Sequence, residues 1–174
     1  LYGVNIHMNT FNIASNLWIV KDCFDPDTMI WLNDIKTNMD NRFSVSRPHL
    51  RLLLDDGKDH QRLQQLGLDL LPGLNKLTNY NLNFMVSKFW LDLPGFGCQV
   101  HHDAPDIIVT LQVYIDNDGD TVGAEFLHVN PSIQIPIEPN CGYLNLNTDL
   151  KEHQVISSSG TRTSVVFQYN VIDN

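Results

Sequence analysis

The sequence has few cysteines, few basic residues and no long hydrophobic run. Its three cysteines, Cys23, Cys98 and Cys141, are far apart and odd in number, which argues against a disulfide framework or a zinc-ribbon spacing. No segment approaches the ~18 apolar residues that a membrane helix requires. The opening "LYGVNIHMNTF" also lacks the basic start and apolar core of a signal peptide. We therefore expect a reducing, cytoplasmic compartment and no membrane partner.

Positive charge is scarce as well. The chain has 11 basic and 20 acidic residues and a formal net charge of −9. Such a surface repels phosphate backbones, so we expect no nucleic-acid partner. A small molecule or a peptide suits it better. With 174 residues, of which 43% are apolar and 18% charged, the composition is that of one globular domain with a hydrophobic core.

The first part of the chain, residues 24–78, carries apolar residues at helical spacing. A first helix is expected to begin at Asp25 or Asp27 as its N-cap. A second is expected to be broken at Pro72. The segment between them, residues 41–56, fits either a strand or a loop.

From about residue 80 the pattern is that of short strands separated by Gly, Pro, Asn and Asp. We predict a mainly β protein with N-terminal helices, a jelly-roll-like barrel built as one domain over residues 1–174. Residues 1–80 would form a mostly helical buttress, and residues 81–174 the barrel. The predicted strands cover residues 82–93, 107–115, 124–129, 132–137, 141–146, 153–156 and 161–172.

The stretch "GCQVHHDAP", residues 97–105, contains two adjacent histidines and an aspartate. Side chains alternate along a strand, so His101 and Asp103 point to one side and His102 to the other. His101 and Asp103 are therefore the candidate pair of metal ligands. Taken alone, the tripeptide favours a polar strand end over a metal site.

A third ligand changes that balance, because two imidazoles and one carboxylate are diagnostic of non-haem Fe(II) oxygenases. We interpret "HQVISSSGTRTSVVFQY" as a hairpin in which His153 pairs with Ser164. His153, Arg162 and Ser164 would then share one face. His128 is a rival ligand but has no arginine nearby. Arg162 could alternatively be an ordinary surface arginine.

This pairing suits a 2-oxo acid, which chelates iron through its keto and C1 carboxylate oxygens. Its second carboxylate then requires a fixed cation, and the guanidinium fork of Arg162 matches a carboxylate with two hydrogen bonds. Ser164 would add another. We expect Leu111, Val113 and Val155 to form the apolar lining of such a site.

The pattern His101-x-Asp103, His153 and Arg162-x-Ser164 resembles the Fe(II)- and 2-oxoglutarate-dependent oxygenases, which fold as a double-stranded β-helix. Within them the sequence is most similar to prolyl hydroxylases of the hypoxia-sensing kind and their microbial relatives. The stretches "LPGFGCQVHHDAP", "TLQVYID" and "HQVISSSGTRTSVVFQY" carry the similarity, over about residues 86–171.

The resemblance implies that Fe(II) is bound by His101, Asp103 and His153. It implies that 2-oxoglutarate is held by Arg162, Tyr114 and Ser164. The reaction would hydroxylate an unactivated C–H bond with dioxygen, in a prolyl or other peptidyl residue or in a small molecule. Ascorbate is a further candidate cofactor.

The sequence departs from the prolyl hydroxylases where a tyrosine often precedes the Pro-Gly turn, because Leu93 stands there. Two alternatives stay open: a cupin-type metal protein without 2-oxoglutarate, and a catalytically silent β-helix domain that binds a ligand or a protein. The basic cluster Arg47, His49 and Arg51 fits either a cationic mouth for an anionic substrate or a surface loop.

Overall fold

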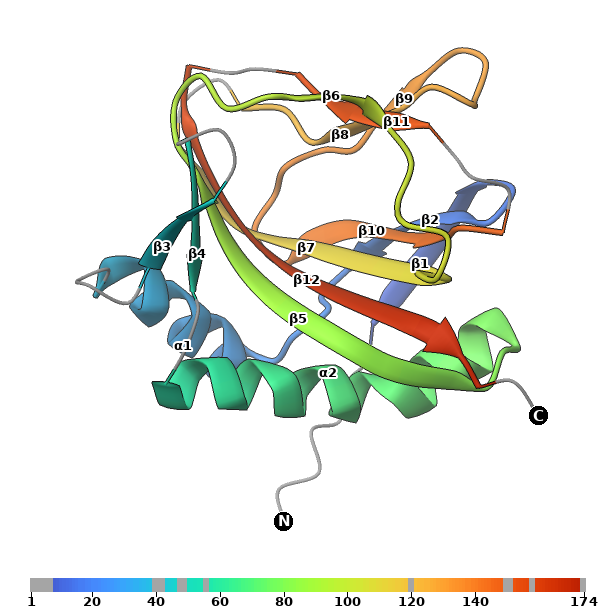
Figure 1. Cartoon of the computed structure of the whole chain (residues 1–174), viewed down its shortest axis with the longest axis horizontal. Coiled ribbons are helices and arrows are strands. Elements are labelled where there is room, and N and C mark those ends of the chain that lie inside the picture. Colours follow the sequence, from blue (N-terminus) through green and yellow to red (C-terminus); the bar gives the residue numbers. More distant parts are fainter. Residues whose placement is uncertain are drawn as a thin grey trace.

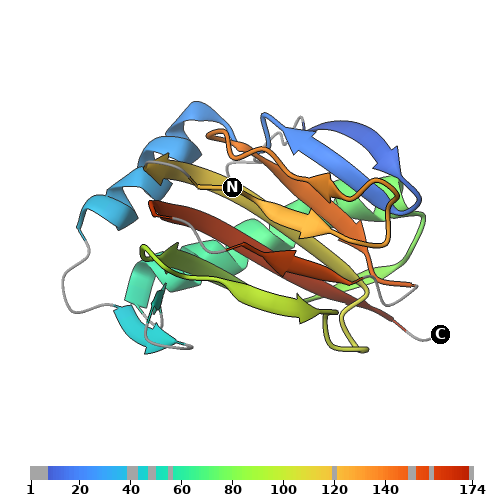
Figure 2. The same ribbon diagram turned by 90° about the horizontal axis from the view of Figure 1, so that it is seen from above.

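The structure, a computed structural model of the chain, consists of two β-sheets that face each other, with two helices outside the larger sheet (Figure 1). Figure 2 shows the smaller sheet lying across the inner face of the larger one. The residues that the structure describes are 8–38, 43–46, 50–54, 57–118, 121–148, 152–156 and 159–172.

The larger sheet contains the long strands and the smaller sheet the short ones. Its eight strands are β1 (Asn9–Ala14), β2 (Leu17–Lys21), β3 (Phe43–Ser46), β4 (Arg51–Leu54), β5 (Leu82–Asp92), β7 (Val109–Asp118), β10 (Cys141–Leu146) and β12 (Thr161–Val171), in the order β1-β2-β10-β7-β12-β5-β4-β3. The smaller sheet has the order β6-β11-β8-β9, formed by β6 (Cys98–His101), β8 (Ala124–Phe126), β9 (Ile133–Gln134) and β11 (His153–Val155). The helices are α1 (Pro26–Thr37) and α2 (Gly57–Thr78).

Alternation along the central strands separates an apolar face from a polar one. Leu111 and Val113 of β7 belong to the main hydrophobic core, which also contains the buried leucines of α1 and α2. The alternate residues Gln112 and Tyr114 point the other way and are buried in the space between the sheets. The helices therefore seal the outer face of the large sheet and leave the inner face for a site.

The first helix begins where the sequence predicted, with Asp25 as its N-cap, whose carboxylate accepts from the backbone N–H of Thr28 at 2.7 Å. The prediction that the second helix is broken at Pro72 was wrong, since α2 continues through it. The carbonyl that a residue-72 N–H would have bonded belongs to Leu68, which is on the exposed side of the helix, where water can satisfy it. No helix in the described part of the chain is both long and apolar enough to cross a membrane.

The predicted mainly β fold with N-terminal helices is confirmed, and all seven predicted strand regions contain a strand. The buttress is more than helical, because β1 to β4 join the larger sheet on both sides of its centre. The ambiguous segment 41–56 contains β3 and β4, which pair with each other. Thus the N-terminal part extends the sheet as well as covering it.

The predicted hairpin between His153 and Ser164 was wrong. Strand β11 pairs with β6 and β8 in the smaller sheet, whereas β12 pairs with β5 and β7 in the larger one. The chain therefore crosses from one sheet to the other between residues 156 and 161. His153 and Arg162 come from opposite sheets rather than from one face of a shared hairpin.

A pair of glycines in α2 provides a test of this packing. A Cβ on Gly67 would lie 2.2 Å from the ring of Phe84 on β5, whereas a Cβ on Gly73 meets nothing within 4 Å. We expect Gly67→Ala to destabilise the fold by about 1–3 kcal/mol through overpacking. The control Gly73→Ala should stabilise it by up to about 1 kcal/mol through helix propensity. Urea denaturation measures both, and equal effects of the two substitutions would contradict the close packing of α2 on β5.

Candidate metal centre

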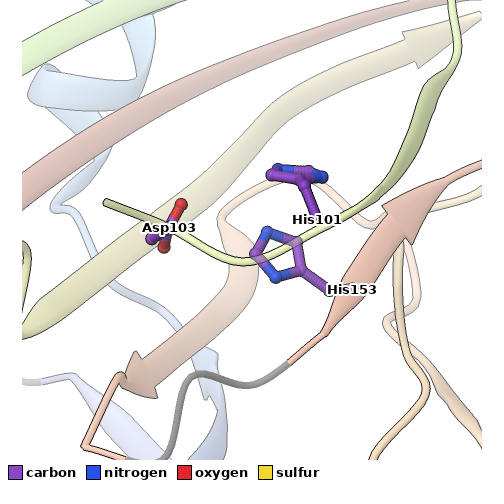
Figure 3. Close-up of side chains that lie close together, drawn as sticks. All are labelled: His101, Asp103 and His153. Carbon is purple, nitrogen blue, oxygen red and sulfur yellow. The ribbon is translucent and has the colours of Figure 1, made fainter. Parts of the chain in front are cut away.

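Three side chains from the space between the sheets form a potential metal-binding group (Figure 3). His101 ends β6, Asp103 lies in the loop that follows, and His153 begins β11. One ligand atom of each residue lies within 4.8 Å of those of the other two. The sequence thus identified three residues that the fold brings together although 50 positions separate Asp103 from His153.

Strand pairing accounts for the proximity of the two imidazoles. Strands β6 and β11 are antiparallel, and His101 is the register partner of His153. Their ring centroids are 4.3 Å apart. On its other side the buried His153 ring stacks on Phe126 of β8, with centroids 5.2 Å apart and planes inclined by 27°. The neighbouring strands therefore restrict the position of the histidine that lies deepest.

The tautomer of His101 follows from one hydrogen bond. Its Nδ1 lies 2.8 Å from the backbone carbonyl oxygen of Gln99, and a carbonyl can only accept. Nδ1 therefore carries the proton in the neutral ring, and Nε2 has a lone pair for a metal. Metal-binding histidines commonly donate their second ring N–H in this way.

The carboxylate of Asp103 is oriented from the larger sheet. Its Oδ2 accepts from Thr110 Oγ1 at 2.7 Å and from Asn147 Nδ2 at 3.1 Å. The same Asn147 amide donates to the backbone carbonyl of Ile107 at 3.0 Å, which fixes it in turn. Both bonds to the carboxylate use one oxygen, so Oδ1 is the oxygen that can face a cation.

This donor set fits a divalent transition-metal ion. Ligand atoms each about 2.1 Å from a metal lie within about 4.2 Å of one another, so small side-chain rotations would close the group around one cation. Two neutral imidazoles and one carboxylate suit iron, and three protein ligands leave coordination positions open. Among the described residues, the group does not include the exposed His102 or the exposed rival His128, whose ring is perpendicular to that of Phe126.

The three ligands lie in one pocket whose walls are partly polar and partly apolar. The other residues that line it are Arg51, Trp90, Cys98, Thr110, Gln112, Tyr143, Val155, Val166 and Gln168. Of the predicted apolar lining, Val155 is therefore present. The prediction for Leu111 and Val113 was wrong, because both face the helices. Neighbouring residues of a strand face opposite sides, so Gln112 in the pocket places Leu111 and Val113 on the helix side.

The three residues predicted to hold a co-substrate are buried and already hydrogen-bonded. The hydroxyl of Tyr114 accepts from the backbone N–H of Ala124 at 3.0 Å, and burial raises its pKa. Ser164 Oγ accepts from Gln112 Nε2 at 3.0 Å, and Tyr143 donates its hydroxyl to Gln112 Oε1 at 2.9 Å. Buried hydrogen bonds thus connect these polar side chains on the inner face of the larger sheet.

Arg162 is almost wholly buried and is paired with an aspartate. Its Nε and Nη2 donate to Asp92 Oδ2, and its Nη1 donates to the carbonyl of Val122 at 3.0 Å. Burial works to lower the pKa of Arg162, but Asp92 outweighs it and raises the pKa, so the guanidinium stays charged. Its ring neighbour is Tyr114, 5.9 Å from the guanidinium carbon.

The sequence did not mark Asp92, Thr110 or Asn147, the residues that fix the charged groups of the site. Asp92 and Asn147 are 70 and 44 positions away from their partners Arg162 and Asp103. Thr110 is only seven positions from Asp103 and opens the stretch "TLQVYID", but nothing in the sequence singled out its hydroxyl. Of the basic cluster flagged in the sequence, Arg51 lines the pocket. Arg47 and His49 lie outside the described residues.

The hydroxyl of Thr110 can be removed without changing the shape of the side chain. We expect Thr110→Val to weaken binding of Ni(II) by about 10–100-fold, because the carboxylate of Asp103 loses one of the bonds that orient it. Isothermal titration calorimetry measures the affinity. The control is Thr163→Val, since the buried hydroxyl of Thr163 has no hydrogen-bond partner among the described residues. Unchanged nickel affinity in Thr110→Val would show that this bond does not position the ligand.

Comparison by sequence finds no match: no family model and no curated protein matches the chain. Comparison by structure finds many. A 2-oxoglutarate-Fe(II) oxygenase family oxidoreductase from Burkholderia pseudomallei superposes with a TM-score of 0.73 at 14% identity, covering 90% of this chain and 84% of that one.

Two further structures resemble the chain to a similar degree. A prolyl hydroxylase from Trichoplax adhaerens, in complex with a hypoxia-inducible-factor peptide fragment, has a TM-score of 0.68 at 12% identity over 90% of this chain and 84% of its own. The α-ketoglutarate-dependent epimerase SnoN of nogalamycin biosynthesis has a TM-score of 0.69 at 13% identity, over 88% and 77%. The chain therefore has the jelly-roll fold of the 2-oxoglutarate- and Fe(II)-dependent oxygenases.

Proposed function

We propose that this protein is an Fe(II)- and 2-oxoglutarate-dependent dioxygenase with His101, Asp103 and His153 as its metal ligands. The observation that carries the proposal is the convergence of two imidazoles and one carboxylate in a pocket between the sheets. The fold shared with oxygenases of this kind supports it. A structural histidine pair would require neither the aspartate nor the hydrogen bonds that orient it.

When bound, Fe(II) with 2-oxoglutarate would supply the oxidising power for C–H hydroxylation by dioxygen, releasing succinate and carbon dioxide. The protein's own residues prepare the site. His101 and Asp103 each direct one ligand atom inward, because their other polar atoms are bonded to Gln99, Thr110 and Asn147. The buried Phe126 ring stacks on His153 and limits the access of water from that side.

The distal carboxylate of 2-oxoglutarate requires a cation in the same pocket. The resemblance assigns this role to Arg162, with Tyr114 and Ser164, and that assignment stays a prediction. Arg162 donates to Asp92, and so does Arg51, through Nε at 2.5 Å and Nη2 at 3.0 Å. The guanidinium groups of Arg162 and Arg51 are therefore both candidates to bind the distal carboxylate of 2-oxoglutarate.

Proteins with this fold include enzymes of different kinds, so the fold alone does not define the primary substrate. A prolyl hydroxylase in complex with a peptide fragment and an epimerase of nogalamycin biosynthesis share this architecture. We propose hydroxylation of a prolyl or other peptidyl residue, or of a small molecule, without choosing among them. Succinate release in a substrate screen identifies the class.

Anaerobic titration with Fe(II) and 2-oxoglutarate tests the proposal directly. We expect a weak visible charge-transfer band from the wild-type protein. His101→Ala, Asp103→Ala and His153→Ala should each abolish it, because each removes one of three ligands. The matched control is His102→Ala, which removes an exposed imidazole next to the site and should leave the band unchanged.

Two outcomes would contradict the proposal in different ways. Iron binding without any response to 2-oxoglutarate would favour a cupin-type metal protein that uses no 2-oxo acid. Failure of the folded wild-type protein to bind iron at all would favour a catalytically silent domain.

A further inference from the structure

The inner face of the larger sheet carries a lysine next to the metal centre that the proposed function does not yet use. Lys88, Trp90 and Asp92 alternate along β5 and therefore share one face of the strand. Trp90 lines the pocket, so this face is the inner one. Lys88 thus lies along the wall of the space between the sheets, on the same strand as the aspartate that holds both arginines.

Two residues that line the pocket are neighbours of the Lys88 ammonium. Its Nζ lies 3.5 Å from Gln168 Oε1 on β12 and 5.7 Å from the ring centroid of Trp90. Gln168 is the register partner of Thr110 on β7, whose hydroxyl donates to the metal ligand Asp103. The lysine is therefore at the end of the site where Asp103 is held.

Lys88 and Arg162 are at opposite ends of the site. The register partner of Arg162 is Asp92, whereas that of Lys88 is Val166. Four residues of strand separate these two pairs, a distance of about 13 Å at a rise of about 3.3 Å per residue. A co-substrate that extends from the metal towards the arginines therefore leaves the Lys88 end to the primary substrate.

The ammonium of Lys88 forms no salt bridge with the described residues. Its side chain is half-buried, and burial lowers the pKa of Lys88. The carboxylate of Asp103 acts to raise this pKa but does not outweigh burial, and the guanidinium of Arg51 lowers it further. A partly desolvated cation without a counter-ion is unfavourable, so an anion next to Lys88 would stabilise it.

The charges of the loaded site would balance except at this lysine. With both histidines neutral, Asp103 and the C1 carboxylate of 2-oxoglutarate would neutralise a divalent metal ion. Asp92 and the distal carboxylate of the co-substrate would neutralise Arg51 and Arg162, whichever arginine receives that carboxylate. Lys88 then retains one uncompensated positive charge beside the pocket. The group that complements the loaded site is therefore a single negative charge.

We propose that Lys88 binds a carboxylate of the primary substrate, and that the enzyme therefore acts on a small carboxylic acid. The inference rests on the proposed function and names a substrate class that the fold leaves open. A prolyl residue inside a peptide has an amide in place of its own carboxylate, so an unpaired cation favours a free acid over such a residue. The indole of Trp90 next to the ammonium provides an apolar wall for the carbon chain of the acid.

Matched acids and amides test this inference by binding alone. The Ni(II) and 2-oxoglutarate form can be titrated calorimetrically with N-acetyl-L-proline, with N-acetyl-L-leucine and with the primary amide of each. Acid and amide differ in charge but hardly in shape. The wild-type protein should bind the acids at least about tenfold more tightly, the size of one charge-assisted hydrogen bond. Lys88→Gln should reduce the preference to about one, and Lys88→Arg should retain it.

Lys76→Gln is the matched control, because it removes an exposed lysine of α2 on the outer side of the larger sheet. It should preserve the preference for acids. The affinities of Lys88→Gln for Ni(II) and for 2-oxoglutarate should equal those of the wild-type protein, which shows that the site has folded. A fall in 2-oxoglutarate affinity in Lys88→Gln would overturn the inference, because it would assign the lysine to the co-substrate.

The failure of the inference and the failure of the proposed function can be told apart. If the wild-type Ni(II) form binds no 2-oxoglutarate, the proposed function fails. If it binds 2-oxoglutarate but does not bind the acids more tightly than the amides, only the inference is wrong. The same holds if Lys88→Gln keeps the preference of the wild-type protein.

Discussion

The site depends on the antiparallel pairing of β6 with β11. This pairing places His101 opposite His153, with the centroids of the two imidazoles 4.3 Å apart. A slip of one residue would turn each imidazole to the other face of the sheet. The pairing is short, and β11 has only three residues, so its register is supported from the other side by β8, where Phe126 packs on His153.

The second requirement is a connection between the sheets. Asp103 follows a strand of the smaller sheet, but Thr110 of β7 in the larger sheet and Asn147, just after β10, hold its carboxylate. The ligand group therefore spans the space between the two sheets. A cation bound there would add a link between sheets that loops, side-chain packing and hydrogen bonds such as that from the Ala124 N–H to the Tyr114 hydroxyl already connect. Metal binding and the relative position of the sheets are therefore physically coupled.

Much of this arrangement could be read from the sequence, for identifiable reasons. The His-x-Asp spacing and strand alternation were enough to choose His101 over His102, because both rest on local geometry. The partner of β11 could not be read in the same way. The loop after Ile156 has the composition of a hairpin turn, yet the chain crosses to the other sheet there. Long-range pairing is decided by burial of the whole strand, and the eleven residues of β12 bury more against β5 and β7 than three residues of β11 could offer.

Long-range pairing, which the sequence does not reveal, also accounts for the position of Asp92. In sequence it stands before a Pro-Gly turn and looks like an ordinary polar residue at the end of a strand. In the fold it lies between two arginines from strands that are 41 and 70 positions away. The buried carboxylate of Asp92 pairs with Arg162 of β12 and with Arg51 of β4. The N-terminal part therefore contributes an ion-pair partner as well as additional strands. Strand β4 lies between β5 and the edge strand β3, and through Arg51 it contributes a side chain to the pocket. Removal of Asp92 would leave both guanidinium groups without their common partner, which is costly for buried charges. The ion pairs therefore tie the N-terminal strand β4 to the central strands β5 and β12 beside the site.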